Sequence, residues 1–152
     1  MSDDLNIQRL ARALRGPLQG WGFAIPEQGT FAPTYLGGTT PGVTTYAVQV
    51  GAWTRIGPRL LFDLTLQWTA ATGTGTVRVG GLPYPSANVT NQNFTAAIYS
   101  TTVTFPNTGI DVLMGVNVQS LRFFSPATNA ANAELVVEAA GLIICSGSYL
   151  IA

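Results

Sequence analysis

Hydrophobic and polar side chains alternate along residues 60–68 of the chain. One face of this segment carries Leu60, Phe62, Leu64, Leu66 and Trp68, and the other carries Leu61, Asp63, Thr65 and Gln67. Because successive side chains of a strand point to opposite faces, this period of two predicts a strand with one buried face. The apolar segment Ala52–Ile56 precedes it, and Gly57-Pro58 suits a two-residue turn between the two. The pattern therefore predicts a β-hairpin.

Further short apolar segments follow the same rule and are separated by turn residues. Strands are predicted at Thr44–Val50, Thr76–Val79, Phe94–Phe105, Val112–Val118, Ser120–Phe124, Leu135–Val137, Gly141–Cys145 and Ser148–Ile151. Such a series is typical of an all-β fold, and we predict an antiparallel β-sandwich of the jelly-roll type over residues 42–152. Its core is expected to contain Ile56, Phe62, Leu64, Leu66, Trp68, Val77 and Val79.

Residues 1–41 have a different pattern and are predicted to form a separate region. Ser2–Arg15 is expected to be a short helix that ends before Gly16-Pro17. Its apolar face carries Ile7, Leu10 and Leu14. Gly20–Gly42 is expected to be an extended arm, and Trp21 and Phe23 stand near its start. A helix this short needs a surface to pack on, which is either its own domain or another protein.

Charged residues make up only 9% of the chain, and seven arginines balance seven acidic residues. Such a surface is poorly soluble for a free monomer, so we expect much of it to be covered by copies or partners. A balanced charge gives no basic field for nucleic acid. The sequence has no apolar run of membrane-spanning length, and its acidic start is unlike a signal peptide, so we expect no membrane insertion and synthesis in the cytoplasm.

The sequence contains few side chains suited to catalysis, because histidine and lysine are both absent. A Ser-His or Cys-His nucleophile, an ordinary zinc site and a lysine nucleophile are thereby excluded. Glu134 and Glu138 flank a predicted strand and are interpreted as surface charges, and Asp63 is expected to pair with Arg55 or Arg59. The remaining acids are too scattered for calcium. We expect no enzyme, metal or cofactor, and a buried Cys145.

Three strings in order carry a resemblance to a known family. They are G-A-W-T-R-I-G at Gly51–Gly57, L-F-D-L-T-L at Leu61–Leu66 and G-T-G-T-V-R-V-G-G-L-P-Y at Gly73–Tyr84. Together they resemble a β-sandwich module of tailed-phage virions, found in tail-fibre and spike tips and in capsid decoration proteins. The resemblance implies a structural protein of the virion that forms a homotrimer. The apolar strand Gly141–Cys145 would then meet the core on one face and a neighbouring subunit on the other.

The first function that the resemblance implies is capsid decoration. A decoration, or cement, protein lies on the outer surface of the capsid, where its partner is the major capsid protein. The short chain beginning at Met1 and the N-terminal helix and arm favour this role. The side chains expected to anchor it are Ile7, Leu10, Leu14, Trp21 and Phe23.

The alternative function is a tail-fibre or head-spike tip that recognises glycans of the host surface. Aromatic rings and amides in loops would bind the sugars, and the candidates are Tyr84, Asn88, Asn91, Asn93 and Tyr99. The competing interpretation, which we favour, makes the tyrosines strand-end core residues and the asparagines turn formers.

Overall fold

The long hairpin predicted from the alternating pattern is the largest paired element of the fold. In the computed structural model, which describes residues 25–152, it consists of β3 (Thr44–Ile56) and β4 (Arg59–Ala71). Ile56 pairs with Arg59 across the turn, and Gly57 has a φ of 58°, which glycine adopts readily in a two-residue hairpin turn. The predicted hairpin is therefore confirmed, and its first strand is longer than expected because Thr44–Val50 and Ala52–Ile56 are one continuous strand.

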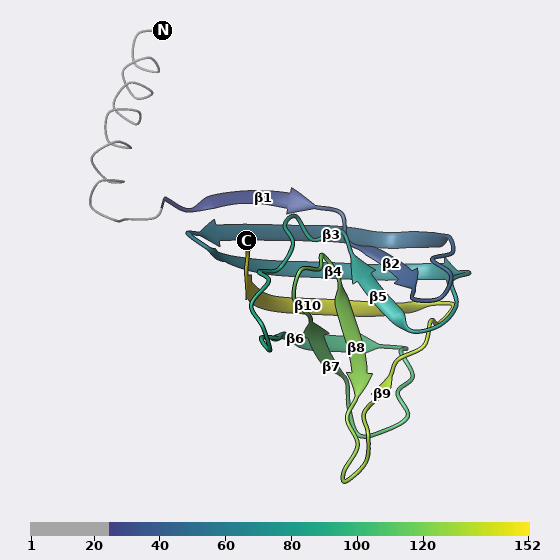
Figure 1. The fold of residues 1–152 in the computed structure, drawn as a ribbon. Coiled ribbons are helices and arrows are strands. Elements are labelled where there is room, and N and C mark those ends of the chain that lie inside the picture. The colour runs from purple at the N-terminus through teal and green to yellow at the C-terminus, as the bar shows by residue number, and fades with distance from the viewer. Residues whose placement is uncertain (1–24) are drawn as a thin grey trace, which may run out of the picture.

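The described residues form one antiparallel sheet and no helix (Figure 1). The other strands are β1 (Glu27–Phe31), β2 (Thr34–Gly37), β5 (Val77–Gly80), β6 (Phe94–Thr101), β7 (Asp111–Met114), β8 (Leu121–Ser125), β9 (Ala133–Glu134) and β10 (Gly141–Leu150). The strand order is β1-β3-β4-β10-β6-β7-β8-β5-β2, and β9 pairs with β8. The predicted all-β, antiparallel class is confirmed. The predicted helix Ser2–Arg15 lies outside the described residues.

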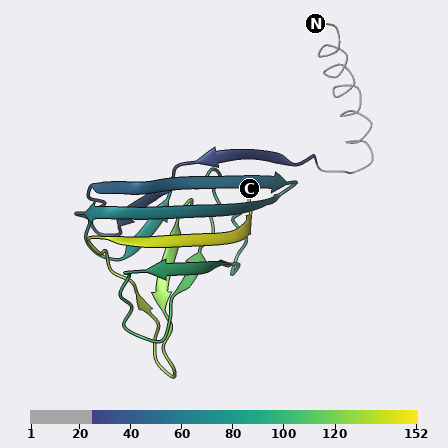
Figure 2. The same cartoon turned by 180° about the vertical axis from the view of Figure 1, so that it is seen from behind.

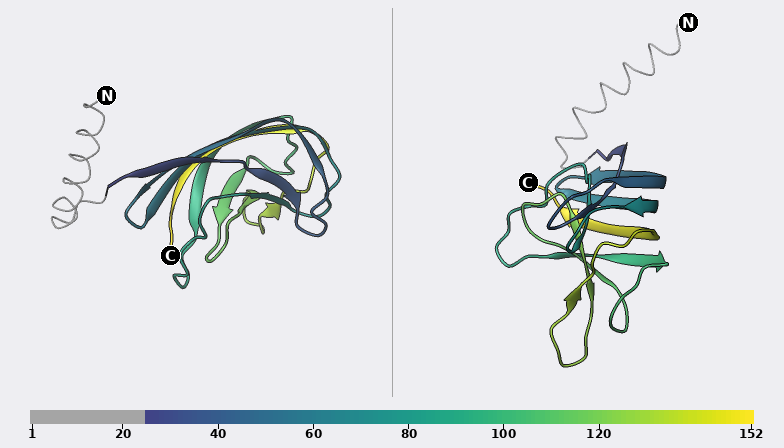
Figure 3. Two further views of the ribbon diagram at one scale, coloured as in Figure 1. Left: turned by 90° about the horizontal axis from the view of Figure 1, so that it is seen from above. Right: turned by 90° about the vertical axis from the view of Figure 1, so that its right-hand side faces the viewer.

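The sheet is strongly curled rather than divided into two layers. The long strands β3, β4 and β10 lie side by side (Figures 1 and 2). Seen from above, they arch over the short strands β7, β8 and β5, so the sheet forms a half-barrel with a concave and a convex face (Figure 3). All of the strands belong to one hydrogen-bonded ladder, and the two separate sheets of a sandwich or jelly roll are not seen in the described part of the chain.

The predicted arm and strands differ from the observed ones in several places, and β6 and β7 end at Thr101 and Met114, earlier than predicted. Glu27–Phe31 and Thr34–Gly37, expected in the arm, form β1 and β2 of the sheet. The last two predicted strands are one strand, β10. Leu135–Val137 is not a strand: Val136 forms a single bridge to Thr76, and the neighbouring ladder is limited to β9.

The concave face holds the core. Six of the seven residues predicted for the core are buried, namely Phe62, Leu64, Leu66, Trp68, Val77 and Val79. The prediction was wrong for Ile56, whose side chain is 46% exposed. The register explains the error: Trp53 pairs with Phe62 on the concave side, so Ile56, three residues further along β3, points to the convex side.

Tyr35 of β2, at one end of the curled sheet, meets Trp68 of the interior strand β4 across this core. Their rings stack with centroids 4.0 Å apart, and each residue is 1% exposed. Both also bind the backbone of Glu138: the indole N–H of Trp68 donates to its carbonyl at 3.0 Å, and its amide donates to the Tyr35 hydroxyl at 3.0 Å. We call these three residues the Tyr35–Trp68 clamp. It holds β2 against β4, although the two strands are far apart in the ladder.

Two local features of the backbone make room for the clamp. The β3–β4 register shifts on both sides of Tyr46, and this bulge turns the Tyr46 side chain to the concave face, where its hydroxyl accepts a hydrogen bond from the Tyr35 amide at 2.8 Å. Gly141 lies beside the indole, and a Cβ at this position would stand 2.6 Å from the Trp68 ring. A larger residue at position 141 would therefore displace Trp68.

Ionisable side chains of the core remain protonated at neutral pH. Burial raises the pKa of the Cys145 thiol to about 12, which confirms Cys145 as a buried core residue rather than a reactive thiol. Burial likewise raises the pKa of Tyr35 and of Tyr149 to about 12. The Tyr149 hydroxyl donates to the Tyr84 carbonyl at 2.8 Å. These hydroxyls therefore act as hydrogen-bonding groups of the core.

A leucine-to-alanine substitution is expected to lower the free energy of unfolding by very different amounts on the two faces of β4. Leu66→Ala empties a site on the concave face where the side chain is 0% exposed, and is expected to lower the free energy of unfolding by about 2–5 kcal/mol. Leu61→Ala is the matched control, because Leu61 lies on the convex face of the same strand and is 43% exposed; its expected cost is about 1 kcal/mol or less. Urea denaturation measures both values. Equal losses would contradict the assignment of the two faces.

Candidate functional site

The convex face of the sheet carries an apolar row that crosses four strands. Val50 of β3 pairs with Thr65 of β4, Thr65 with Ile144 of β10, and Ile144 with Tyr99 of β6. Side chains at paired positions share one face of a sheet, so these four form a continuous line, which we call the convex row. Val50 is 59% exposed, Ile144 38% and Tyr99 60%. Large apolar side chains aligned on an open face are typical of a contact surface.

The prediction that the strand Gly141–Cys145 meets the core on one of its two faces is confirmed. Ile143 and Cys145 are 1% exposed in the core, whereas Ile144 belongs to the convex row. The alternation of a strand produces this division directly.

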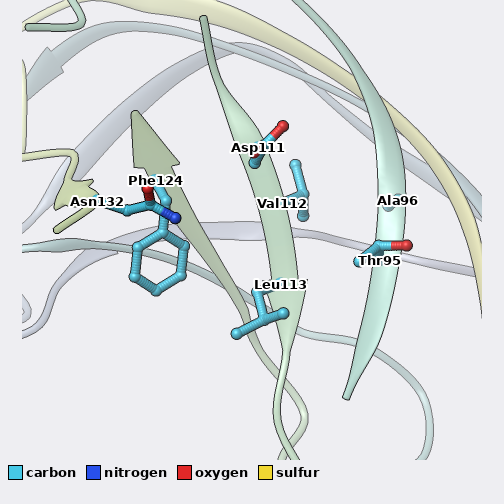
Figure 4. Close-up of a pocket in the computed structure, with 7 residues that line it drawn as sticks. All are labelled: Thr95, Ala96, Asp111, Val112, Leu113, Phe124 and Asn132. Carbon is cyan, nitrogen blue, oxygen red and sulfur yellow. The ribbon is translucent and has the colours of Figure 1, made fainter. Parts of the chain in front are cut away.

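A second surface lies where β6, β7 and β8 run beside one another. Here the structure has an open hollow of about 530 Å³ (Figure 4). Its lining residues are Thr95, Ala96, Asp111, Val112, Leu113, Phe124 and Asn132. We call it the β7–β8 hollow. Leu113 pairs with Thr95 on one side, and Asp111 pairs with Phe124 on the other, so these four side chains leave the sheet on the same, outer face.

A group of ion pairs fixes the wall of the hollow behind Phe124. Arg122 forms a salt bridge with Glu134, and its guanidinium carbon lies 5.0 Å from the centre of the Phe124 ring. Arg78 approaches the same carboxylate at 3.3 Å. The cation–π contact orients the ring, and two arginines around one carboxylate neutralise Glu134. Glu134 is therefore a structural group of this wall.

Two polar side chains, those of Asn132 and Asp111, lie at the mouth of the hollow. Asn132 lies in the loop between β8 and β9, where its side-chain oxygen accepts a hydrogen bond from the Ala127 amide at 3.2 Å. This contact directs the Asn132 amide NH₂ group away from the loop backbone. Asp111 is exposed at the start of β7. Figure 4 shows the Phe124 ring between Asn132 and Leu113, which combines an apolar surface with amide and carboxylate groups.

The five residues proposed for glycan binding are not gathered into one site. Tyr84 packs edge-on against Trp53 at 5.5 Å, and Trp53 faces the concave side, whereas Tyr99 belongs to the convex row. Asn88, Asn91 and Asn93 lie in the exposed loop before β6, and Asn91 has a φ of 62°, a conformation that asparagine adopts in turns. The interpretation of Tyr84 as a packed residue and of Asn91 as a turn former fits this geometry, whereas that of Tyr99 as a core residue was wrong, because its side chain is 60% exposed.

The carboxylates singled out in the sequence have structural partners. Asp63 accepts a hydrogen bond from the Ser146 hydroxyl, while Arg55 pairs with Glu27 at 3.6 Å and Arg59 donates to Ser148, so the predicted pairing of Asp63 with an arginine was wrong. The reason is that β10, not β3, supplies the nearest polar side chain on the convex face.

Glu138 accepts a hydrogen bond from the Thr104 amide at 2.6 Å. Among the described residues, no three His, Cys, Asp or Glu side chains are grouped as metal ligands, and no helix is long and apolar enough to cross a membrane. The proposed anchoring residues Ile7, Leu10, Leu14, Trp21 and Phe23 lie outside the described residues.

The β7–β8 hollow was missed from the sequence. One signal was available: in Leu121–Ser125, Leu121 and Phe123 occupy the buried positions, so Phe124 must face outward. A large aromatic ring at an outward position of a strand is a better indicator of a surface site than an aromatic residue in a loop. Its proximity to Asp111 and Asn132 depends on strand pairing and could not be read from the sequence.

Comparison with solved structures shows a related fold. The chain superposes on part of the crystal structure of the Dettilon tailspike protein (gp208) with a TM-score of 0.67 and 16% sequence identity. The match covers 84% of this chain and 24% of the tailspike chain, so this chain spans about a quarter of that protein. At this identity the likeness concerns the fold. No protein-family model and no curated protein matches the sequence.

Proposed function

We propose that this chain is a structural protein of a tailed-phage virion and that it works through its exposed surfaces. The observation that carries the proposal is the likeness in fold to a phage tailspike chain over 84% of the residues. The three strings between Gly51 and Tyr84, which resemble a virion module, support the same class independently. The curled sheet contributes a stable frame, and the convex row and the β7–β8 hollow are its candidate contact surfaces.

The chain has two candidate positions in the virion, the tail and the capsid surface. The tailspike likeness favours the tail, where the chain would form part of a receptor-recognition tip. Capsid decoration, with the major capsid protein as partner, is the second candidate and depends on residues 1–24, which carry the amphipathic and aromatic side chains. We therefore put the tail first.

We further propose that the chain assembles as a homotrimer through the convex row. Val50, Ile144 and Tyr99 are exposed on a face with few charges; each is only partly exposed, so its burial contributes less than the roughly 1.5–3 kcal/mol of a fully exposed side chain. The centre of a subunit interface is usually depleted of charged residues, and the convex face shares this property.

The position in the virion can be measured directly. Purified particles are separated into heads and tails, and each fraction is probed with an antibody against the chain. Signal in the tail fraction is expected, and signal on the head lattice supports decoration. Absence from purified virions would overturn the proposed function.

A truncated protein that lacks residues 1–24 keeps β1 and the whole sheet, and it separates anchoring from folding. If these residues anchor the protein, the truncated form is folded but lost from the particle. Full occupancy by the truncated form would refute anchoring.

If the trimer forms through the convex row, a charged side chain in that row should prevent assembly. Ile144→Asp places a carboxylate at the proposed interface and should convert the trimer to a monomer, because burying an unpaired charge is costly. Thr108→Asp, on an exposed loop outside the row, is the control and should leave the mass unchanged. Light scattering at micromolar concentration measures both masses. A monomeric wild-type protein would contradict the trimer.

A further inference from the structure

The apolar part of the β7–β8 hollow is a surface suited to a flat, partly apolar ligand. Phe124 and Leu113 face outward from neighbouring strands and line the hollow together. Arg122 lies beside Phe124 on the same face of β8, and its contact with the ring at 5.0 Å restricts the orientation of the ring. Sugar rings carry an apolar face of C–H groups that packs on aromatic side chains, whereas most other polar metabolites lack such a face.

The polar groups of the hollow complement hydroxyl groups. A hydroxyl both donates and accepts hydrogen bonds, so the hydroxyls of one sugar ring can bind an acceptor and a donor at different points of the hollow. The exposed Asp111 carboxylate is an acceptor, and the Asn132 NH₂ group is a donor because its oxygen already binds the Ala127 amide. Thr95 adds a hydroxyl of its own on the β6 side.

The charges around the hollow select against an anionic ligand. Arg78 and Arg122 are occupied by Glu134, and Asp111 adds a further negative charge at the mouth. The two positive and two negative side chains balance, so no net positive field attracts a carboxylate or phosphate. The volume of about 530 Å³ lies in the range of 300–1,000 Å³ that is usual for small-ligand sites.

We infer that the β7–β8 hollow binds a neutral saccharide, with Phe124 and Leu113 against the sugar ring and Asp111 and Asn132 at its hydroxyls. This inference deepens the proposed function, since it names the ligand class of a receptor-recognition tip. It also moves the glycan site from the Tyr84 and Tyr99 set to another surface.

The test uses the full chain on an array of neutral hexose and N-acetylhexosamine oligosaccharides, with uronic-acid and sialylated oligosaccharides beside them. Hits are followed by calorimetric titration. We expect binding to neutral oligosaccharides, and Phe124→Ala and Asp111→Asn should each weaken it by about 5- to 100-fold, as the loss of one buried contact predicts. Binding confined to acidic oligosaccharides, or no binding at all, overturns the inference.

Matched controls keep the result specific to this hollow. Phe105→Ala removes an exposed phenylalanine elsewhere, and Asp63→Asn changes a carboxylate on the convex face; both should bind within about twofold of the wild type. Phe124→Leu keeps the wall of the hollow apolar, so this variant should fold normally and still bind the sugar weakly. It therefore separates a loss of binding from a failure to fold. Equal affinity of the wild type, Phe124→Leu and Asp111→Asn overturns the site. Presence of the protein in virions without sugar binding refutes this inference alone, whereas sugar binding by a protein absent from virions refutes only the virion role.

Discussion

The stack of Tyr35 on Trp68 is the contact on which the shape of this protein depends. The ladder has free edges at β1 and β2; residues 32–33 and 38–43 link β2 to β1 and β3 along the chain, and the side chains of β2 must still pack against the centre of the sheet to close the curl. The Tyr35–Trp68 clamp does this through ring contact and through two hydrogen bonds to one residue, Glu138. An aromatic pair of this kind contributes about 0.5–1.5 kcal/mol beyond its buried area, and the burial of two large rings contributes more.

The curl decides which faces of the molecule can bind partners. Its concave side is filled by the core, where the buried thiol and tyrosines stay protonated. The surfaces proposed to contact other molecules lie on the convex face, which includes the outer side of β6, β7 and β8. The convex row and the β7–β8 hollow meet on this face, because Tyr99 of the row and Thr95 of the hollow both point outward from β6.

Sequence patterns predicted the parts of the fold that depend on neighbours along the chain. The alternation in β4 identified Leu64 and Leu66 as core residues, and the glycine turn identified the hairpin. Features that depend on pairing between distant strands were not predictable. Tyr35 was placed in an arm because its partner Trp68 is 33 positions away, Ile56 was assigned to the wrong face because its register was unknown, and the hollow around Phe124 needs three strands to form.

Hydrogen exchange of a Tyr35→Ala variant tests most directly whether the clamp holds the curled sheet. Tyr84→Ala serves as the comparison, because it removes a half-buried tyrosine that does not bridge β2 and β4. If the clamp closes the sheet, amides of β2 and β5 lose protection in Tyr35→Ala while those of the β3–β4 hairpin keep it, because that hairpin has its own ladder. Unchanged protection of β2 and β5, or the same loss in both variants, would contradict this account.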